Sequence, residues 1–208
     1  MIGCMTRWKP DASGRLLHAA IELFSERGYE ATTAAQIAAH AGLTKTTLFR
    51  HFADKREILF QGQEVLIAAV AGGVANSPAG SSPMELLRGG IESLCGAHSE
   101  DLREVGKLLD PLLERTPELQ ERAMFKRSAL TRALQDALVS RIGDAHQAGV
   151  LADVGIRAYY EGYAAWMLAG DAGALFESAE NELKDYETAL RQTVDGFEDV
   201  RRDHGSQR

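Results

Sequence analysis

One short group of polar side chains near the N-terminal end has the composition that hydrogen bonds to nucleobase edges require. The group consists of four side chains within two turns of one predicted helix: Lys45, Thr46, Thr47 and Arg50. Lysine and arginine can donate to O6 and N7 of guanine, while threonine offers a hydroxyl and a methyl group that suits thymine. The alternative is a solvated helix face, so the elements that hold these residues must decide between the two.

Two short helical patterns around a turn would position this group. Thr33 can cap the first helix, with a glutamine three residues later completing a capping box, and Gly42 can take the left-handed conformation that ends it. Thr44 can cap the second helix, on which Leu48 and Phe52 point one way and the polar group points elsewhere. This layout predicts a helix-turn-helix, whose second helix enters the major groove of DNA. Burial of the polar face would instead indicate a motif used only for packing.

Further residues near the motif are candidates for contacts to the DNA backbone, which fix register without reading sequence. Thr33 is one. Thr44 and His51 could also approach a phosphate, although a helix cap and a packed ring are the respective alternatives. Lys55 follows a capping Asp54, in a first helical turn where the helix dipole disfavours cations. A bound phosphate would resolve that conflict, so Lys55 is predicted to be a backbone anchor rather than a solvated charge.

The charge distribution agrees with a nucleic-acid contact near the N-terminal end. The whole chain of 208 residues carries a net charge of −7. Residues 1–56, however, hold eight basic and five acidic residues, or +3, whereas the remainder holds 15 basic and 25 acidic residues, or −10. A basic head can approach phosphates although the acidic body is repelled by them.

Catalysis, metal binding and disulfide formation find no support in the sequence, and no cofactor is expected. The chain has no phosphate-cradling glycine loop, no serine nucleophile in a turn and no metal-type cluster of histidines and carboxylates. Of its two cysteines, Cys4 and Cys95, the second is expected to be a small buried hydrophobe rather than a redox sensor. The longest apolar run, residues 65–71, is too short to span a bilayer, and no signal peptide is apparent. A cytoplasmic protein that is not an enzyme is therefore expected.

The chain predicts helices throughout, without a strand-period segment or a repeat. A first helix is expected to end at Arg27, before Gly28. The fourth would start at Asp54 and be ended or weakened by two consecutive glycines, where residues 72–82 have the composition of a linker. Pro111 should kink or end the sixth helix. The later helices are expected to start near residues 82, 99, 116 and 153, with the seventh running to about residue 148 and the eighth to about residue 169.

One late helix concentrates bulky side chains: Tyr159, Tyr160, Tyr163, Trp166 and Met167. Positions 159, 163, 166 and 167 share one face, whereas position 160 does not. Aromatic residues are common both in ligand pockets and in protein interfaces, and a core position is the more ordinary explanation for most of them. The sequence leaves pocket, interface and core open for this helix.

Residues 16–59 resemble the TetR family of bacterial transcriptional regulators. The stretches AAIELFSERGYEATT and IAAHAGLTKTTLFRHFADKREIL carry the resemblance. Their order of helix, Gly-aromatic, threonine, helix, AGL and TKTTLFRHF is specific to that family among helix-turn-helix proteins. Phe49 stands where the family usually has tyrosine, which removes a hydroxyl that often reaches a phosphate, whereas His51 keeps the family's pattern. The rest of the chain matches only in length, helix order and helical character.

The resemblance implies an all-α homodimer of about nine helices. Residues 1–56 would form the helix-turn-helix domain, and residues 57–208 a helical domain that binds an effector and dimerises through its last two long helices. DNA contacts are then expected from Thr33, Thr44, Lys45, Thr46, Thr47, Phe49, Arg50, His51 and Lys55. The effector pocket is expected from His98, Leu102, Val105, Leu109, Leu134, Tyr159, Tyr163 and Trp166, and the dimer interface from Tyr160, Met167, Tyr186, Leu190, Val194 and Phe197.

The predicted function is that of a transcriptional regulator, most simply a repressor that a small molecule releases from a palindromic double-stranded operator. The alternative is a DNA-binding dimer whose C-terminal domain senses a protein partner or no ligand. No membrane partner is expected.

Overall fold

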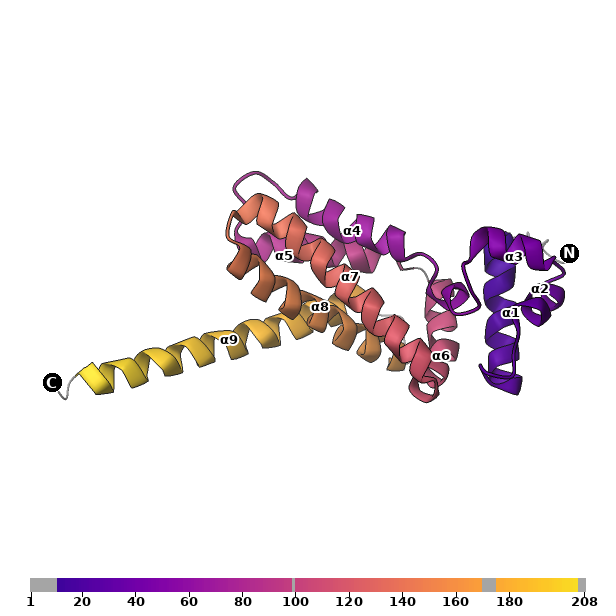
Figure 1. Ribbon diagram of the computed structural model, residues 1–208. Helices are drawn as coiled ribbons and strands as arrows, with labels where there is room; N and C mark the ends of the chain where they lie inside the picture. The colour runs from indigo at the N-terminus through magenta and orange to yellow at the C-terminus, as the bar shows by residue number, and fades with distance from the viewer. Residues whose placement is uncertain (1–10, 99, 170–174, 206–208) are drawn as a thin grey trace, which may run out of the picture. The chain divides into compact units, whose positions relative to one another are not determined.

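The computed structural model describes residues 11–98, 100–169 and 175–205, and within these ranges all regular structure is helical (Figure 1). The all-α prediction is confirmed. In chain order the elements are α1 (Ala12–Arg27), α2 (Ala34–His40), α3 (Lys45–His51), a 3-10 turn η1 (Glu57–Phe60), α4 (Gln63–Asn76), α5 (Pro83–Gly96), α6 (Glu100–Arg115), α7 (Pro117–Ile142), α8 (Ala145–Leu168) and α9 (Leu175–Gly205).

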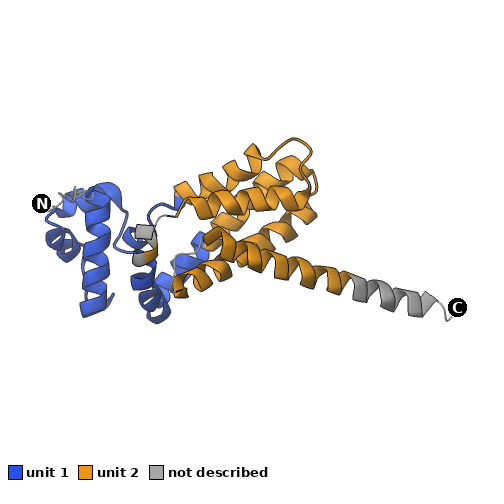
Figure 2. Cartoon of the chain, turned by 180° about the vertical axis from the view of Figure 1, so that it is seen from behind, with its two compact units in different colours: residues 1–63, 104–126 blue, residues 64–103, 127–208 orange. Residues whose placement is uncertain are grey.

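Packing divides the chain into two compact units (Figure 2). The first unit comprises residues 1–63 and 104–126, and the second comprises residues 64–103 and 127–208. The predicted boundary after residue 56 differs from this division, because most of α6 and the start of α7 pack with the N-terminal helices. The chain therefore passes between the units inside or at the start of three helices, α4, α6 and α7.

The core of the first unit is built on α1. Leu16 and Phe24 of α1 are buried together with Ile37 of α2 and Leu48 of α3. Leu119, near the start of α7, is completely buried in the same cluster. The apolar sides of the two short helices thus rest on α1, which leaves their polar sides for solvent or a ligand.

The second unit packs α8 against α9, with α5 contacting both helices. Its core includes Leu87 of α5, Leu134 of α7 and Ile156 of α8. At the end of α4, the Arg141 guanidinium donates four hydrogen bonds of 2.8–3.1 Å to the carbonyl oxygens of residues 74, 75, 77 and 78. Arg141 therefore adds a charged donor to carbonyls in the last turn of α4 and in the two residues that follow it.

The predicted fourth helix is in fact two elements. Asp54 accepts from the backbone amides of Arg56 and Glu57 and starts only the short turn η1. Gly62, at a φ of 81°, breaks the helical conformation before α4 begins. Of the two effects predicted for the glycines near residue 72, an end of the helix is wrong, because α4 continues to Asn76. A Cβ on Gly73 would lie 2.2 Å from the carbonyl oxygen of Gly89, so this glycine serves a close approach to α5 instead of ending a helix.

The junction of α7 and α8 lies earlier than predicted. Gly143 has a φ of 79°, and the Asp144 side chain caps α8 by accepting from the amides of His146 and Gln147. Gly149, predicted to close the seventh helix, lies inside α8. Pro111 likewise lies inside α6, which continues to Arg115.

The stretch Glu57–Asn76 has a mean hydropathy of 1.5 and could cross a membrane by length and composition. Its helical part, α4, has 14 residues and rises about 21 Å at 1.5 Å per residue, which is short of the roughly 30 Å hydrocarbon core of a bilayer. Leu66, Val70 and Val74 of α4 are buried in the core of the second unit. Core packing accounts for these three apolar side chains, whereas Val65 on the same helix is 61% exposed.

Candidate nucleic-acid interface

Both helices of the motif begin where the sequence predicts. The Thr33 side chain accepts from the amide of Gln36, whose side chain accepts from the Thr33 amide, so the predicted capping box is present. Thr44 caps α3 by accepting from the amide of Thr47 at 3.1 Å, and the two hydroxyls lie 2.9 Å apart. Gly42 ends α2 with a φ of 65°. The turn therefore fixes the direction in which α3 leaves it.

The polar face of α3 is open to solvent. Lys45, Thr46 and Arg50 are exposed, and Thr47 is half-buried beside its cap. Leu48, by contrast, is completely buried. The burial that would have indicated a motif used only for packing is therefore not observed, and this face is accessible to a ligand.

Phe49 and His51 complete the exposed side of α3. Phe49 is 47% exposed, and the Lys45 ammonium lies 5.6 Å from its ring centroid. The Phe49 ring can therefore steady the Lys45 side chain, although it cannot donate to a phosphate as a tyrosine would. His51 is exposed, with its ring 6.2 Å from that of Phe52.

Arg15 is a residue of this site that the sequence did not reveal. Its guanidinium reaches from α1 to the turn of the motif, donating to the carbonyl oxygens of Ala41 and, at 3.2 Å, of Gly42. A Cβ on Gly42 would lie 2.9 Å from the same guanidinium. The motif is thus fastened to α1 by a polar clamp as well as by apolar packing, and a partner 26 residues away leaves no local signal in the sequence.

The structure differs from the expectation for Lys55. Its ammonium donates to the carbonyl oxygens of Tyr29 at 2.6 Å and Thr32 at 3.0 Å, and lies 4.0 Å from the centroid of the Tyr29 ring. Thr32, which is buried, donates in turn to the carbonyls of Leu23 and Gly28. Lys55 therefore holds the connection between α1 and α2. Because it precedes the short turn η1 and does not lie in the first turn of an α-helix, the expected conflict with a helix dipole does not arise.

We expect Lys55→Met to lower the free energy of unfolding by about 1–2 kcal/mol, because two carbonyl oxygens lose a charged donor. Chemical denaturation measures this loss. The same variant should keep the wild-type dependence of DNA affinity on salt concentration. A salt slope reduced by about one unit would instead indicate a direct phosphate contact.

Aromatic and polar side chains cluster within the second unit around α8. The His98 Nε2 lies 2.7 Å from the buried Tyr159 hydroxyl, and its ring is 5.6 Å from that of Tyr163, which lies 5.8 Å from Trp166. The buried Arg103 donates to the carbonyls of Trp166 and Ala169. Burial raises the pKa of the Tyr159 hydroxyl well above its usual value, so this group stays a neutral donor.

The predicted pocket residues divide between the two units. His98, Leu134, Tyr159, Tyr163 and Trp166 belong to the second unit. Val105 and Leu109 pack against the core of the first unit, and the side chain of Leu102 lies outside what the structure describes. Two grooves among the described residues, of about 710 Å³ in the first unit and 580 Å³ in the second, are lined by other residues.

The residues predicted for the dimer interface also have different surroundings. Met167 is buried in the core, and Tyr160 lies with its ring centroid 5.0 Å from the Arg127 guanidinium. Tyr186 donates to Glu161. Leu190 and Val194 of α9 are 36% and 55% exposed, while the side chain of Phe197 lies outside the described part.

Cys95 is buried, and burial together with Glu92 raises the pKa of its thiol to about 12. This agrees with a small hydrophobe. Any stability that the neutral thiol contributes is present below its ordinary pKa and is lost as pH rises from about 9 towards 12.

In a Cys4→Ser variant we expect Cys95 to react with a thiol reagent at pH 8 only as fast as the protein unfolds. The labelling rate and the unfolding rate, both measured at increasing denaturant concentrations, test this. Rapid labelling of the native protein would contradict this burial.

The N-terminal part of this chain is similar to a known protein family. The family model described as "Bacterial regulatory proteins, tetR family" matches residues 16–61. The HTH-type transcriptional regulator TcmR of Streptomyces glaucescens is 30% identical over 134 residues, which cover 62% of this chain and 59% of TcmR. The chain thus matches less than two thirds of that relative.

Two further proteins are similar over more of their length. The HTH-type transcriptional activator FasR of Mycolicibacterium smegmatis is 26% identical over 146 residues, covering 69% of this chain and 67% of FasR. The solved SmeT–triclosan complex is 17% identical, with a TM-score of 0.60 over 86% of this chain and 91% of SmeT. SmeT is the repressor of the Stenotrophomonas maltophilia multidrug efflux pump SmeDEF. This last similarity concerns the fold.

Proposed function

The chain belongs to the TetR family of bacterial transcriptional regulators, and from this premise we propose that it is a cytoplasmic repressor that binds a palindromic operator as a homodimer. The observation that carries the proposal is the exposed polar face of α3, formed by Lys45, Thr46 and Arg50, on a helix that is capped and fastened to α1. Such a face has the composition that base edges in the major groove require.

Different residues of the motif have different parts in this proposal. Lys45, Thr46 and Arg50 read base edges, with Arg50 the donor suited to a bidentate contact with guanine. Thr33 and His51, both exposed, contact the DNA backbone. Thr44 and Thr47 mainly hold the start of α3, since their hydroxyls are already engaged with each other. Phe49 supports Lys45 by lying beside its ammonium.

Dimerisation supplies the second recognition helix. Operators of helix-turn-helix dimers place their half-sites about 34–36 Å apart, or one turn of DNA. Leu190 and Val194 lie four residues apart on α9 and are exposed apolar side chains, which favours their burial in a self-complementary interface. The proposed dimer therefore uses α9 together with α8, the helix against which α9 packs.

The proposed effector site is the cluster around His98, Tyr159, Tyr163 and Trp166 in the second unit. Its rings offer apolar and stacking surface, and an effector that separates His98 from Tyr159 would find a hydroxyl and an imidazole to bond to, the combination that small-molecule sites generally have. An effector would release the operator only to the extent that it binds the non-operator conformation more tightly. The similarity to an activator makes activation the second candidate function.

Selection of duplexes from a random-sequence DNA library by the full-length protein tests the proposal. We expect enrichment of an inverted repeat with half-sites about one helical turn apart, and a complex that contains two chains by sedimentation. Absence of any enriched sequence at physiological salt would contradict the proposed operator binding. Enrichment of a single, non-repeated site would contradict the dimer.

A further inference from the structure

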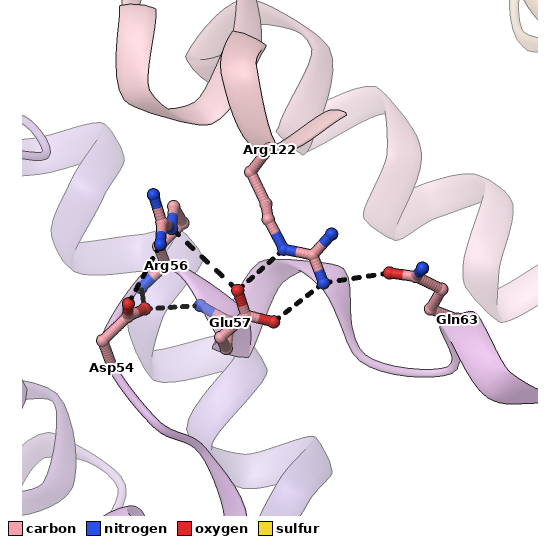
Figure 3. Close-up of polar contacts among 5 residues, drawn as sticks. All are labelled: Asp54, Arg56, Glu57, Gln63 and Arg122. Atoms are coloured by element: carbon pink, nitrogen blue, oxygen red, sulfur yellow. Dashed lines mark hydrogen bonds and ion pairs between the residues drawn. The ribbon is translucent and has the colours of Figure 1, made fainter. Parts of the chain in front are cut away.

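Arg122 makes three polar contacts on the segment that follows the recognition helix (Figure 3). Its Nε donates to Glu57 Oε1 at 2.7 Å, and its Nη2 donates to Glu57 Oε2 at 3.0 Å and to Gln63 Oε1 at 2.9 Å. The guanidinium also lies 5.5 Å from the ring centroid of Phe60 and 5.2 Å from that of Phe125. A forked, two-bond contact fixes direction as well as distance.

The surroundings of this ion pair favour a persistent contact. The side chains of Arg122 and Glu57 are 15% and 28% exposed, so water screens their attraction less than it screens a surface pair. The hydrogen bond to Glu57 raises the pKa of the Arg122 guanidinium, which keeps the donor charged. Arg56 also lies 3.9 Å from Glu57 and bonds to Asp54, so Glu57 has a second guanidinium beside it, which it shares with the Asp54 carboxylate.

The two residues that Arg122 holds mark the ends of one connecting segment. Glu57 begins η1, and Gln63 begins α4, with the positive-φ Gly62 between them. This segment leads from α3 into α4, one of the helices in which the chain passes to the second unit. Arg122 itself lies on α7, which belongs to the first unit up to Lys126 and to the second from Arg127. The contacts therefore join two of the chain's crossings between the units.

We propose that Arg122 is a positioning residue for operator binding: its contacts with Glu57 and Gln63 lock the connecting segment to α7 and so set the orientation of the DNA-binding head. This inference rests on the proposed function. Without the lock, the segment before Gly62 is held only by the apolar packing of Ile58, Leu59 and Phe60, and each head samples a wider range of orientations, some of which do not fit an operator. Binding must then restrict that freedom, which weakens affinity. An effector that shifts α7 would act on the head through the same contacts.

Alternatively, the Arg122–Glu57 pair only stabilises the fold. The dependence of operator affinity on the spacing of the half-sites distinguishes the two roles. A rigid head tolerates one spacing, because both recognition helices must meet their grooves together. A less tightly held head binds its best spacing less tightly and loses less affinity when the spacing changes. Loss of stability alone lowers the fraction of folded protein and leaves the relative preference among spacings unchanged.

The test uses the full-length protein and the inverted repeat that the wild type selects from random DNA, together with versions lengthened or shortened by one base pair. Arg122→Met keeps an apolar stem against the two phenylalanines and removes the donors. Glu57→Gln removes the acceptor charge in case the first variant folds poorly, and the double variant measures their coupling. Arg115→Met, at the exposed end of α6, removes one positive charge from the same unit without touching the pair.

We expect both single variants to bind the selected operator about 10-fold less tightly, a size typical of residues that couple sites, and to discriminate less among spacings. The double variant should lose no more than either single one, and Arg115→Met should keep the wild-type spacing profile. Variants that fold and show the wild-type affinity and spacing profile would overturn the inference alone. A wild-type protein that selects no sequence would overturn the proposed function, and this inference with it.

Discussion

Gly162→Ala is expected to destabilise the protein by about 3 kcal/mol, the upper end of the usual cost of overpacking. A Cβ at position 162 of α8 would lie 2.5 Å from both the Cα and the nitrogen of Ala179, in α9. These are backbone atoms of a buried residue, so the clash is relieved only by separating α8 from α9. The loss opposes the gain in helix propensity that alanine normally brings over glycine.

Gly149→Ala provides the matched control on the same helix. There the added Cβ would meet only the end of the Gln135 side chain, at 3.4 Å, so this variant should be as stable as the wild type or slightly more so. Urea denaturation gives the two free energies of unfolding, and sedimentation follows the proposed dimer, which depends on the same two helices. Equal stabilities for the two variants would show that α8 and α9 can separate at little cost.

Local signals made the helix starts predictable from the sequence. The boxes at Thr33 and at Ser82 are both present, because each requires only residues three positions apart. The α7–α8 junction was missed because two glycines, Gly143 and Gly149, compete for it and only the backbone shows which one has a positive φ. Glycines that serve close approach, such as Gly73 and Gly162, have the same identity in the sequence as glycines that end helices.

In the candidate site, too, features that depend on neighbouring residues were predictable from the sequence, and contacts between distant residues were not. The exposed face of α3 follows in part from spacing within one helix, since burying Leu48 turns Thr46 and Arg50, each two residues away, to the opposite side. The contacts of Lys55, Arg15 and Arg122 could not be read in this way, because their partners lie 23 to 65 residues away. For Lys55 the dipole argument assumed a helix start that the structure does not have, and it did not reveal the internal carbonyls that the ammonium contacts.

The α6 and α7 segments show why the domain boundary was also hard to place. Leu112 and Leu119 have the spacing of ordinary core residues, and the sequence does not say which core they join. The structure places them with α1 in the first unit. The functional boundary predicted after residue 56 and the boundary between the packed units therefore fall at different positions. In the proposed mechanism, α4, α6 and α7, in which the chain passes from one unit to the other, would transmit an effector's signal to the DNA-binding head.

Arg50→Ala should weaken binding to the selected operator by about 10- to 100-fold, the range that one bidentate arginine–guanine contact supplies. Arg50 is exposed on α3 and has no ion-pair partner among the described residues, so its guanidinium is available to DNA and its loss should leave the fold intact. The variant should also lose discrimination at one base position of each half-site. Titration of the selected operator and of its single-base variants measures both effects.

Arg27→Ala is the matched control for charge, since Arg27 is likewise an exposed arginine of the first unit that has no ion pair with a described residue. We expect it to bind more weakly only through the lost positive charge, by a similar factor on every sequence. Base discrimination that survives in Arg50→Ala, with an affinity loss equal to that of Arg27→Ala, would remove Arg50 from the readout. Sequence recognition would then rest on Lys45 and Thr46, the two other exposed polar side chains of this face.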